Sequence, residues 1–278
     1  MYAHQTNLHV PDSRSGWIKQ LAKFGLYANG TVYVLIGTLA FMAAFGLNGK
    51  TTANAGKQSI FTFLLDQPFG KILVGLVVLG LICYAIWRLI QAFMDTESFG
   101  KDAKGLARRL GYAFSGLVYG GLAFSGFKLL QGNAQSSGGN SQQTLADTLL
   151  DKPFGQWLLG IIGLATIGLG IYQIYKGLSG KFLKRIRESQ IKPEWRKALV
   201  RAGKIGYPAR GIVWGIIGYL LLKASLHANA QEAGGTKSAF HFLENSTFGP
   251  FLLGAVALGL ICYGIFMFVR GRYETINT

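Results

Sequence analysis

The stretch PFGKILVGLVVLGLICYAIWRLIQAFM, from Pro68 to Met94, begins with a tight turn and continues as an apolar run long enough to cross a membrane. The turn recurs as Pro153-Phe154-Gly155 and, with one change, as Thr247-Phe248-Gly249, so the copies start 85 and then 94 residues apart. Each copy leads into another Gly-rich apolar run. Self-similarity at a regular spacing is the signature of a repeat protein, and this pattern predicts three tandem copies of a two-helix unit.

The composition is that of an integral membrane protein. Half of the 278 residues are hydrophobic, 14% are charged and 39 are glycine. Six stretches are almost free of charge over roughly 20 residues, the length that a helix needs to cross the hydrocarbon layer. The predicted fold is an all-α membrane protein with six transmembrane helices in three parallel two-helix repeats, an arrangement compatible with a pseudo-threefold axis. The predicted spans are Leu26 to Gly46, Ile72 to Met94, Tyr112 to Gln131, Phe154 to Tyr175, Tyr207 to Leu226 and Pro250 to Val269.

Basic residues divide unequally between the two sides of these spans. Of the 28 Lys and Arg residues, 21 fall in the tails and in the loops that follow the second and fourth spans. The positive-inside rule then places both termini in the cytoplasm, with the protein in the bacterial inner membrane. The first span follows a polar tail of about 25 residues and matches the third and fifth in repeat position, so we interpret it as a retained helix rather than a cleaved signal.

The domain organisation follows from the repeat. We expect two cytoplasmic tails, three two-helix repeats and a basic linker before the third repeat. The predicted boundaries are 1–20 for the N-terminal tail, 21–95 for repeat 1, 105–180 for repeat 2, 181–200 for the linker, 201–272 for repeat 3 and 273–278 for the C-terminal tail.

Glycines recur at equivalent positions in the first helix of each repeat. In lipid, helices associate through close packing, and small residues let their backbones approach. We therefore predict that these glycines pack helices within the bundle, with a dimerisation surface as the alternative. The positions are Gly25, Gly111 and Gly206, followed five residues later by Gly30, Gly116 and Gly211.

With these turns and glycines in register, the chain resembles the bacterial domain-of-unknown-function family number 1206 from about Leu21 to Arg272. Members of that family look like three tandem copies of a two-span unit that carries a Pro-Phe-Gly turn. The resemblance implies six spans and an inner-membrane location, and it brings no set of catalytic residues. The sequence departs from the family pattern at Thr247, where the family has Pro, and at Leu169, where the other two copies have Tyr84 and Tyr263.

Charged residues are rare inside the predicted spans, and every acidic residue lies outside them or at their ends. Ion-coupled transporters usually keep a carboxylate within the membrane, so this class is not favoured. The basic residues within or against the spans are taken to be Arg88, Lys128 and Lys223. We expect their side chains to extend to the headgroups. Arg88 lies deepest, and a polar site facing the bundle interior is the alternative for it.

No pattern in the chain predicts catalysis or a cofactor. Histidines do not pair within the spans, so neither a haem nor a metal site is expected. Phosphate-binding glycine loops, nucleophile elbows and carboxylate pairs are not found in the sequence. We therefore expect a protein that is not an enzyme and that holds no cofactor.

The segment from Lys176 to Arg210 contains 11 basic residues with apolar residues between them. Such a stretch is attracted to anionic lipids by about 1 kcal/mol for each Lys or Arg near the surface. We expect a helix to begin at Pro193, with Trp195 and Leu199 in the membrane interface. Headgroup contacts are expected from Arg196, Lys197 and Arg201, while an acidic protein partner is the alternative and no nucleic-acid partner is expected.

Each loop on the other side of the membrane ends in a short apolar segment before the Phe-Gly turn. Apolar residues spaced by three to four positions predict short helices in the interface, and a ring of ligand contacts is the alternative. The segments are Ile60 to Asp66, Leu145 to Asp151 and Ala239 to Asn245.

Two classes of function are compatible with these observations. The first is a non-enzymatic structural, scaffolding or modulatory membrane component with a membrane-protein partner or a second copy of itself. The second is a facilitator or channel for a small neutral or amphipathic solute, or for a lipid. Polar residues within the spans are few and fall at unequal repeat positions, which favours the first class.

Overall fold

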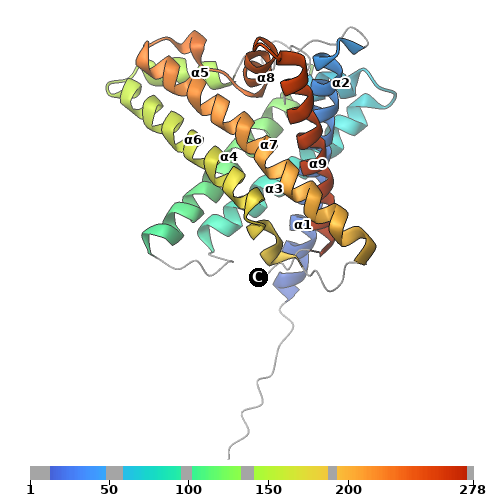
Figure 1. Cartoon of the computed structure of the whole chain (residues 1–278). Coiled ribbons are helices and arrows are strands. Elements are labelled where there is room, and N and C mark those ends of the chain that lie inside the picture. The colour runs from blue at the N-terminus through green and yellow to red at the C-terminus, as the bar shows by residue number, and fades with distance from the viewer. Residues whose placement is uncertain (1–12, 48–58, 95–101, 133–140, 187–192, 274–278) are drawn as a thin grey trace, which may run out of the picture.

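The computed structural model describes residues 13–47, 59–94, 102–132, 141–186 and 193–273, and these residues form helices and turns without any strand. Six helices are long and apolar enough to cross a membrane, which confirms the predicted six-span fold. Figure 1 shows them as a bundle of steeply crossing helices. The helices are α1 Ser13–Ala44, α2 Ser59–Leu65, α3 Gly70–Phe93, α4 Ala103–Leu130, α5 Ser141–Leu150, α6 Gly155–Leu178, α7 Pro193–Leu226, α8 Thr236–Glu244 and α9 Gly249–Tyr273, with short 3-10 helices η4 Lys181–Arg185 and η6 Ala230–Glu232.

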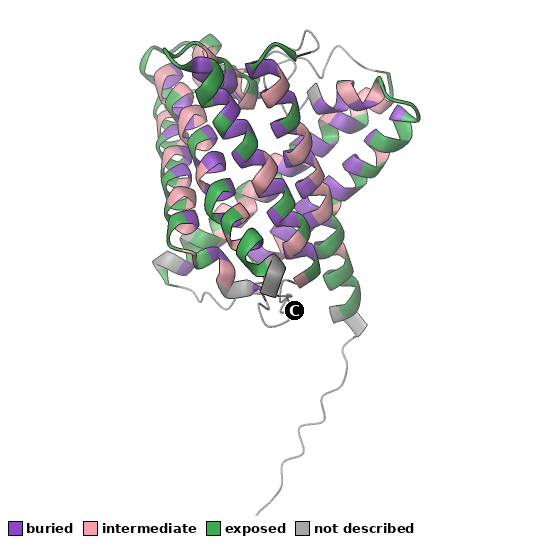
Figure 2. Ribbon diagram, turned by 45° about the vertical axis from the view of Figure 1, so that its right-hand side comes forward, coloured by how far each residue is buried: buried purple, intermediate pink, exposed green. Residues whose placement is uncertain are grey.

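The two ends of the bundle differ. The short helices α2, α5 and α8 occupy the segments for which such helices are predicted, and they lie together at one end, called here the short-helix side (Figure 1). The start of α1 and the end of α9 lie at the opposite end of the bundle, called here the terminal side (Figure 1). Figure 2 shows buried residues along the faces that the helices turn to one another, and exposed residues on their outer faces.

The same hydrogen bond closes the Phe-Gly turn in each repeat. The amide of the turn glycine donates to the carbonyl three residues earlier at 2.9 Å, and this holds also where Thr247 replaces Pro. Phe69 and Phe154 have φ near +60°, a left-handed conformation that is unusual for a side chain of this size. A methyl group on Gly70 or Gly155 would collide with a carbonyl oxygen of the preceding short helix. The glycine therefore lets the short helix fold directly onto the start of the next long one.

The repeats pack against one another through equivalent seams, formed by the first long helix of one repeat and the second long helix of another. These seams are α1 with α9, α4 with α3, and α7 with α6. A methyl group on Gly30 would lie 2.9 Å from the carbonyl oxygen of Gly264, and one on Gly211 would lie 2.6 Å from that of Gly170. At Gly116 the corresponding neighbour is the oxygen of Ala85, at 3.2 Å. The three seams thus repeat the same close backbone approach.

Two repeats also pack internally at one crossing point. Gly25 of α1 lies against the backbone of Tyr84 in α3, and a methyl group there would be 2.7 Å from its Cα. Gly206 of α7 approaches the Cα of Tyr263 in α9 in the same way, at 2.6 Å. The long helices therefore follow one another in the order α3, α1, α9, α7 through tight contacts, with α4 packed on α3 at one end of this row and α6 on α7 at the other.

The helices extend beyond the predicted spans on the terminal side. Helix α7 begins at Pro193, as expected, but it continues without a break to Leu226. The end of the predicted linker is therefore part of a transmembrane helix. Arg109 closes the corresponding end of α3, because its guanidinium donates to the carbonyl oxygens of Ala92 and Phe93 at 2.7 and 3.0 Å.

Candidate functional site

Four buried tyrosines meet inside the bundle where the repeats face one another. Tyr33 of α1 and Tyr119 of α4 hold the same repeat position, and the Tyr119 hydroxyl donates to the Tyr33 hydroxyl at 3.2 Å. Tyr263 stands edge-on to Tyr33, and Tyr84 stands edge-on to Tyr119, each with ring centroids 4.7 Å apart. Edge-to-face pairs of this kind are favourable. The rings fill the space between repeats with an aromatic core that carries hydroxyl groups.

Arg210 of α7 lies against this tyrosine cluster and is nine-tenths buried. Its Nη1 donates to the Tyr263 hydroxyl at 2.6 Å. Its Cζ lies 4.9 to 5.4 Å from the ring centroids of Tyr263, Tyr33 and Trp214. Its Nε is buried and has no hydrogen-bond partner among the described residues. The cation is therefore held mainly by aromatic faces, which attract positive charge.

The charge pattern assigns Arg210 to the basic segment outside the membrane, and this assignment is wrong. The repeat register carries the missed signal, because Arg210 aligns with Asn29 of α1 and Ser115 of α4, both within predicted spans. Asn29 is completely buried, and neither of its amide atoms has a partner in the described part of the chain. Arg270, which directly follows the last predicted span, is likewise a buried residue of α9. The polar interior is thus larger than the sequence predicts.

Arg88 of α3 forms a second cationic centre, and the prediction that it extends to the headgroups is wrong. It is nine-tenths buried, with Nε donating to the Tyr84 hydroxyl at 2.9 Å and Nη1 to Oε1 of Gln91 at 3.0 Å. The ring of Tyr112 in α4 covers the guanidinium, with its centroid 5.0 Å from Cζ. These partners satisfy the cation locally, so it does not need to reach water. Arg88 therefore faces the bundle interior, as the alternative hypothesis of a polar site there requires.

The buried charges of the described residues all have one sign. Arg88, Arg210 and Arg270 are buried, whereas no Asp or Glu of the described ranges is. An arginine at the centre of a transmembrane helix costs about 2.5–3.5 kcal/mol even on the most lenient scale. Such residues mark functional sites by default. The interior is therefore suited to anions and unsuited to cations.

The contact between the two long helices of repeat 1 depends on small residues. A methyl group on Gly80 of α3 would collide with Cβ of Ala28 in α1. The equivalent contact in repeat 3 joins Gly259 of α9 and Ala209 of α7. In both repeats a glycine and an alanine meet where the helices cross, which lets the two backbones come into contact.

Repeat 2 has no such crossing, and the bundle is open between α4 and α6. At the positions of the small pairs in the other repeats it has Phe114 and Ala165, and at the position of Tyr84 and Tyr263 it has Leu169. A methyl group on Gly111 would meet nothing within 4 Å. Only 28% and 22% of the most apolar windows of α4 and α6 are buried, against at least 50% for the other four long helices. Phe114, whose ring lies against Trp214 of α7, is too bulky to make the close backbone contact that Ala28 and Ala209 make in the other two repeats.

The predicted headgroup residues Arg196, Lys197 and Arg201 are exposed on the first turns of α7, and their contact with lipid stays a prediction. The prediction that Leu199 lies in the membrane interface is wrong, because its side chain is buried in the protein core. The side chain of Trp195 lies outside the described residues, as do the polar loop residues 48–58 and 133–140.

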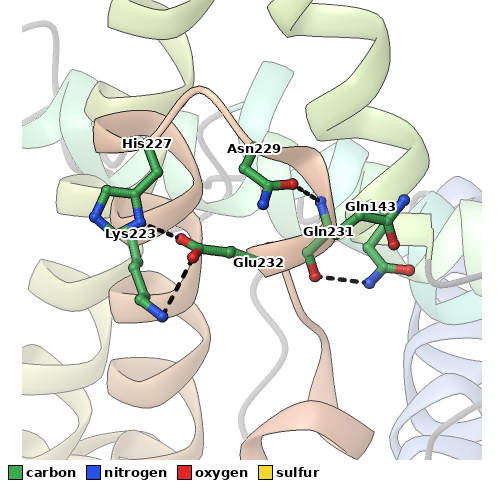
Figure 3. A network of polar contacts seen from close by, with 6 residues as sticks. All are labelled: Gln143, Lys223, His227, Asn229, Gln231 and Glu232. Atoms are coloured by element: carbon green, nitrogen blue, oxygen red, sulfur yellow. Dashed lines mark hydrogen bonds and ion pairs between the residues drawn. The ribbon is translucent and has the colours of Figure 1, made fainter.

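The short-helix side has a hollow of about 830 Å³ between α7, η6 and α8, lined in part by Leu220, Glu232, Lys237, His241 and Phe242. Figure 3 shows the polar network beside it. Glu232 accepts from Nδ1 of His227 at 2.8 Å and lies 3.4 Å from Nζ of Lys223. Burial acts to raise the pKa of Glu232, but the hydrogen bonds from His227 and Lys223 outweigh it, so this pKa lies below its ordinary value. The network ties the loop after α7 back to that helix.

Comparison with known proteins supports the repeat. The chain is 35% identical over 258 residues to the uncharacterized protein YxxB of Bacillus subtilis (strain 168), a match that covers 93% of this chain and 92% of that protein. No solved structure matches the chain. The family described as Domain of Unknown Function (DUF1206) matches in three consecutive segments, residues 24–95, 110–180 and 205–274. The three segments each cover most of the two long helices of one repeat, and the chain therefore belongs to the DUF1206 family.

Proposed function

We propose that this protein is a non-enzymatic membrane component that binds an anionic phospholipid between α4 and α6. The observation that carries the proposal is the open space at Gly111. The equivalent glycines, Gly25 and Gly206, are covered by the backbone of the second helix of their own repeat. In a membrane, apolar helix surfaces that do not meet each other are covered by acyl chains.

The charges on the terminal side favour an anionic headgroup. Arg108 near the start of α4 is exposed, and Nζ of Lys176 near the end of α6 lies 4.9 Å from the ring centroid of Tyr207. Basic residues at the ends of transmembrane helices attract anionic lipids. If the terminal side faces the cytoplasm, as the charge distribution predicts, the headgroup belongs to the anionic inner leaflet.

The facilitator class is less well supported by this geometry. A solute path between the repeats would have to pass the packed rings of Tyr33, Tyr84, Tyr119 and Tyr263. Transport would therefore require these rings to separate. A bound lipid requires no such movement, because the α4 and α6 faces are already uncovered.

Native mass spectrometry after extraction in a mild detergent tests the proposal. Wild type should retain phosphatidylglycerol or cardiolipin in preference to phosphatidylethanolamine. The Gly111→Trp variant should lose this lipid, because the indole fills the space between α4 and α6. Gly75→Trp is the matched control, since Gly75 of α3 also has nothing within 4 Å of an added methyl group but lies away from this opening.

Two outcomes would contradict the lipid assignment. Retention of the same lipid by Gly111→Trp would place it elsewhere on the surface. A lipid-free dimer of wild type that Gly111→Trp dissociates would show that a second copy of the chain covers this face.

A further inference from the structure

A small cavity of about 10 Å³ lies beside Arg210, enclosed by residues of α1, α7 and α9 and by the start of α8. Its lining includes Tyr33, Arg210, Trp214 and Thr236. A volume of roughly this size leaves room for one small particle, such as a water or a monatomic ion. Phosphate and carboxylate headgroups are too large for it.

The polar atoms at this cavity can donate hydrogen bonds to a bound species. Arg210 uses Nη1 on the Tyr263 hydroxyl, while its buried Nε has no partner among the described residues. Asn29 is not one of the lining residues, but it is fully buried, also has no partner in the described part, and lies four residues before Tyr33 on the same face of α1. A buried donor without a partner indicates a water or an ion that completes its hydrogen bonds.

The charge at the cavity selects between these two species. The guanidinium of Arg210 is positive, and the aromatic faces around it do not neutralise it. The described ranges place no buried carboxylate within the bundle. A buried charge needs a counter-charge or extensive hydrogen bonding, and the buried Nε of Arg210 has no partner among the described residues.

We propose that this cavity binds one halide-sized inorganic anion, with Nε of Arg210 as the principal donor and the guanidinium as its counter-charge. The site lies between α1, α7 and α9, so it does not depend on the lipid proposed between α4 and α6. Its occupant would neutralise one of the three buried arginines and fix Arg210 against Tyr263.

Iodide quenching of tryptophan fluorescence tests the site in purified protein, because Trp214 lines the cavity. Wild type should show a saturable quenching component that chloride displaces and that Trp214→Phe removes. Arg210→Gln should weaken iodide binding by about tenfold or more. Arg272→Gln is the matched control, because Arg272 is an exposed residue of the same bundle and should leave binding unchanged.

The proposal is overturned if quenching in wild type rises without saturation, or if Arg210→Gln retains the saturable component. Should Arg210→Gln fail to fold, Arg210→Lys and wild type decide the matter by thermal unfolding. Chloride should then raise the melting temperature of wild type relative to gluconate at equal ionic strength, and the Arg210→Lys increase should be smaller. Equal melting temperatures of wild type in the two salts would mean that a water occupies the cavity.

Discussion

Gly206 and Gly111 hold the same position in their repeats, yet their surroundings are opposite. A methyl group on Gly206 would lie 2.6 Å from the Cα of Tyr263, whereas one on Gly111 would meet nothing within 4 Å. The sequence predicts both as packing residues, because a glycine's own neighbours in the chain do not reveal which backbone lies across from it. The difference between the two glycines lies in the second long helix of each repeat, which has Tyr263 opposite Gly206 in repeat 3 and Leu169 at the equivalent position in repeat 2.

These two glycines therefore give opposite predictions. Gly206→Ala should lower the free energy of unfolding by about 1–3 kcal/mol, because the methyl group has no room. Gly111→Ala should leave it unchanged or raise it by up to about 1 kcal/mol, because alanine is the better helix former. Thermal unfolding of both variants in the same detergent measures the difference. Equal destabilisation by the two substitutions would refute the open α4–α6 face.

At the scale of elements, the long helices and the short helices follow from hydropathy and spacing, whereas the cationic interior does not. The charge count treats a basic residue near a span end as part of a loop. Arg210 and Arg270 show the error, because both are buried residues of long helices, and the rings of Tyr33 and Tyr263 lie against the guanidinium of Arg210. Aligning the repeats by position, rather than counting charges along the chain, places Arg210 with Asn29 inside the bundle.

The loop between α7 and α8 should be sensitive to acid. Because the pKa of Glu232 is lowered in the folded protein, its contribution to stability is fully present above the ordinary carboxyl pKa of about 4.3 and is lost as pH falls through the lower folded value. Amide hydrogen exchange of residues 228–233, corrected for intrinsic rates, should stay slow near neutrality and accelerate below this range. In Glu232→Gln the same amides should exchange faster at neutral pH and respond less to acid, while Glu244→Gln serves as a control outside the network. An unchanged neutral exchange rate in Glu232→Gln would argue against the network shown in Figure 3.

At the scale of the whole molecule, the sequence predicts the number of repeats and their parallel orientation but not the opening between α4 and α6. The departure at Leu169 is visible in the sequence, and its consequence is not. Whether the two long helices of a repeat touch depends on two positions together. In repeat 1 these positions hold the small residues Gly80 and Ala28, and in repeat 2 they hold Ala165 and the bulky Phe114. The positions of both helices in the structure are needed to see that α4 and α6, which carry Phe114 and Ala165, stay apart.

The orientation of the bundle remains a prediction that fusions can test. Alkaline phosphatase fused after Thr278 should be inactive, because both termini are expected in the cytoplasm, where the enzyme does not mature. The same reporter inserted after Ala228, on the short-helix side, should be active. The reverse pattern would show that the basic segment faces away from the cytoplasm.

The seam between α1 and α9 has a consequence for biosynthesis. Because α1 is synthesised before α9, the glycines of α1 that abut α9, among them Gly30, have no partner until α9 has been made. Synthesis of α9 then closes this seam, and a chain truncated before α9 would leave the packing face of α1 around Gly30 uncovered.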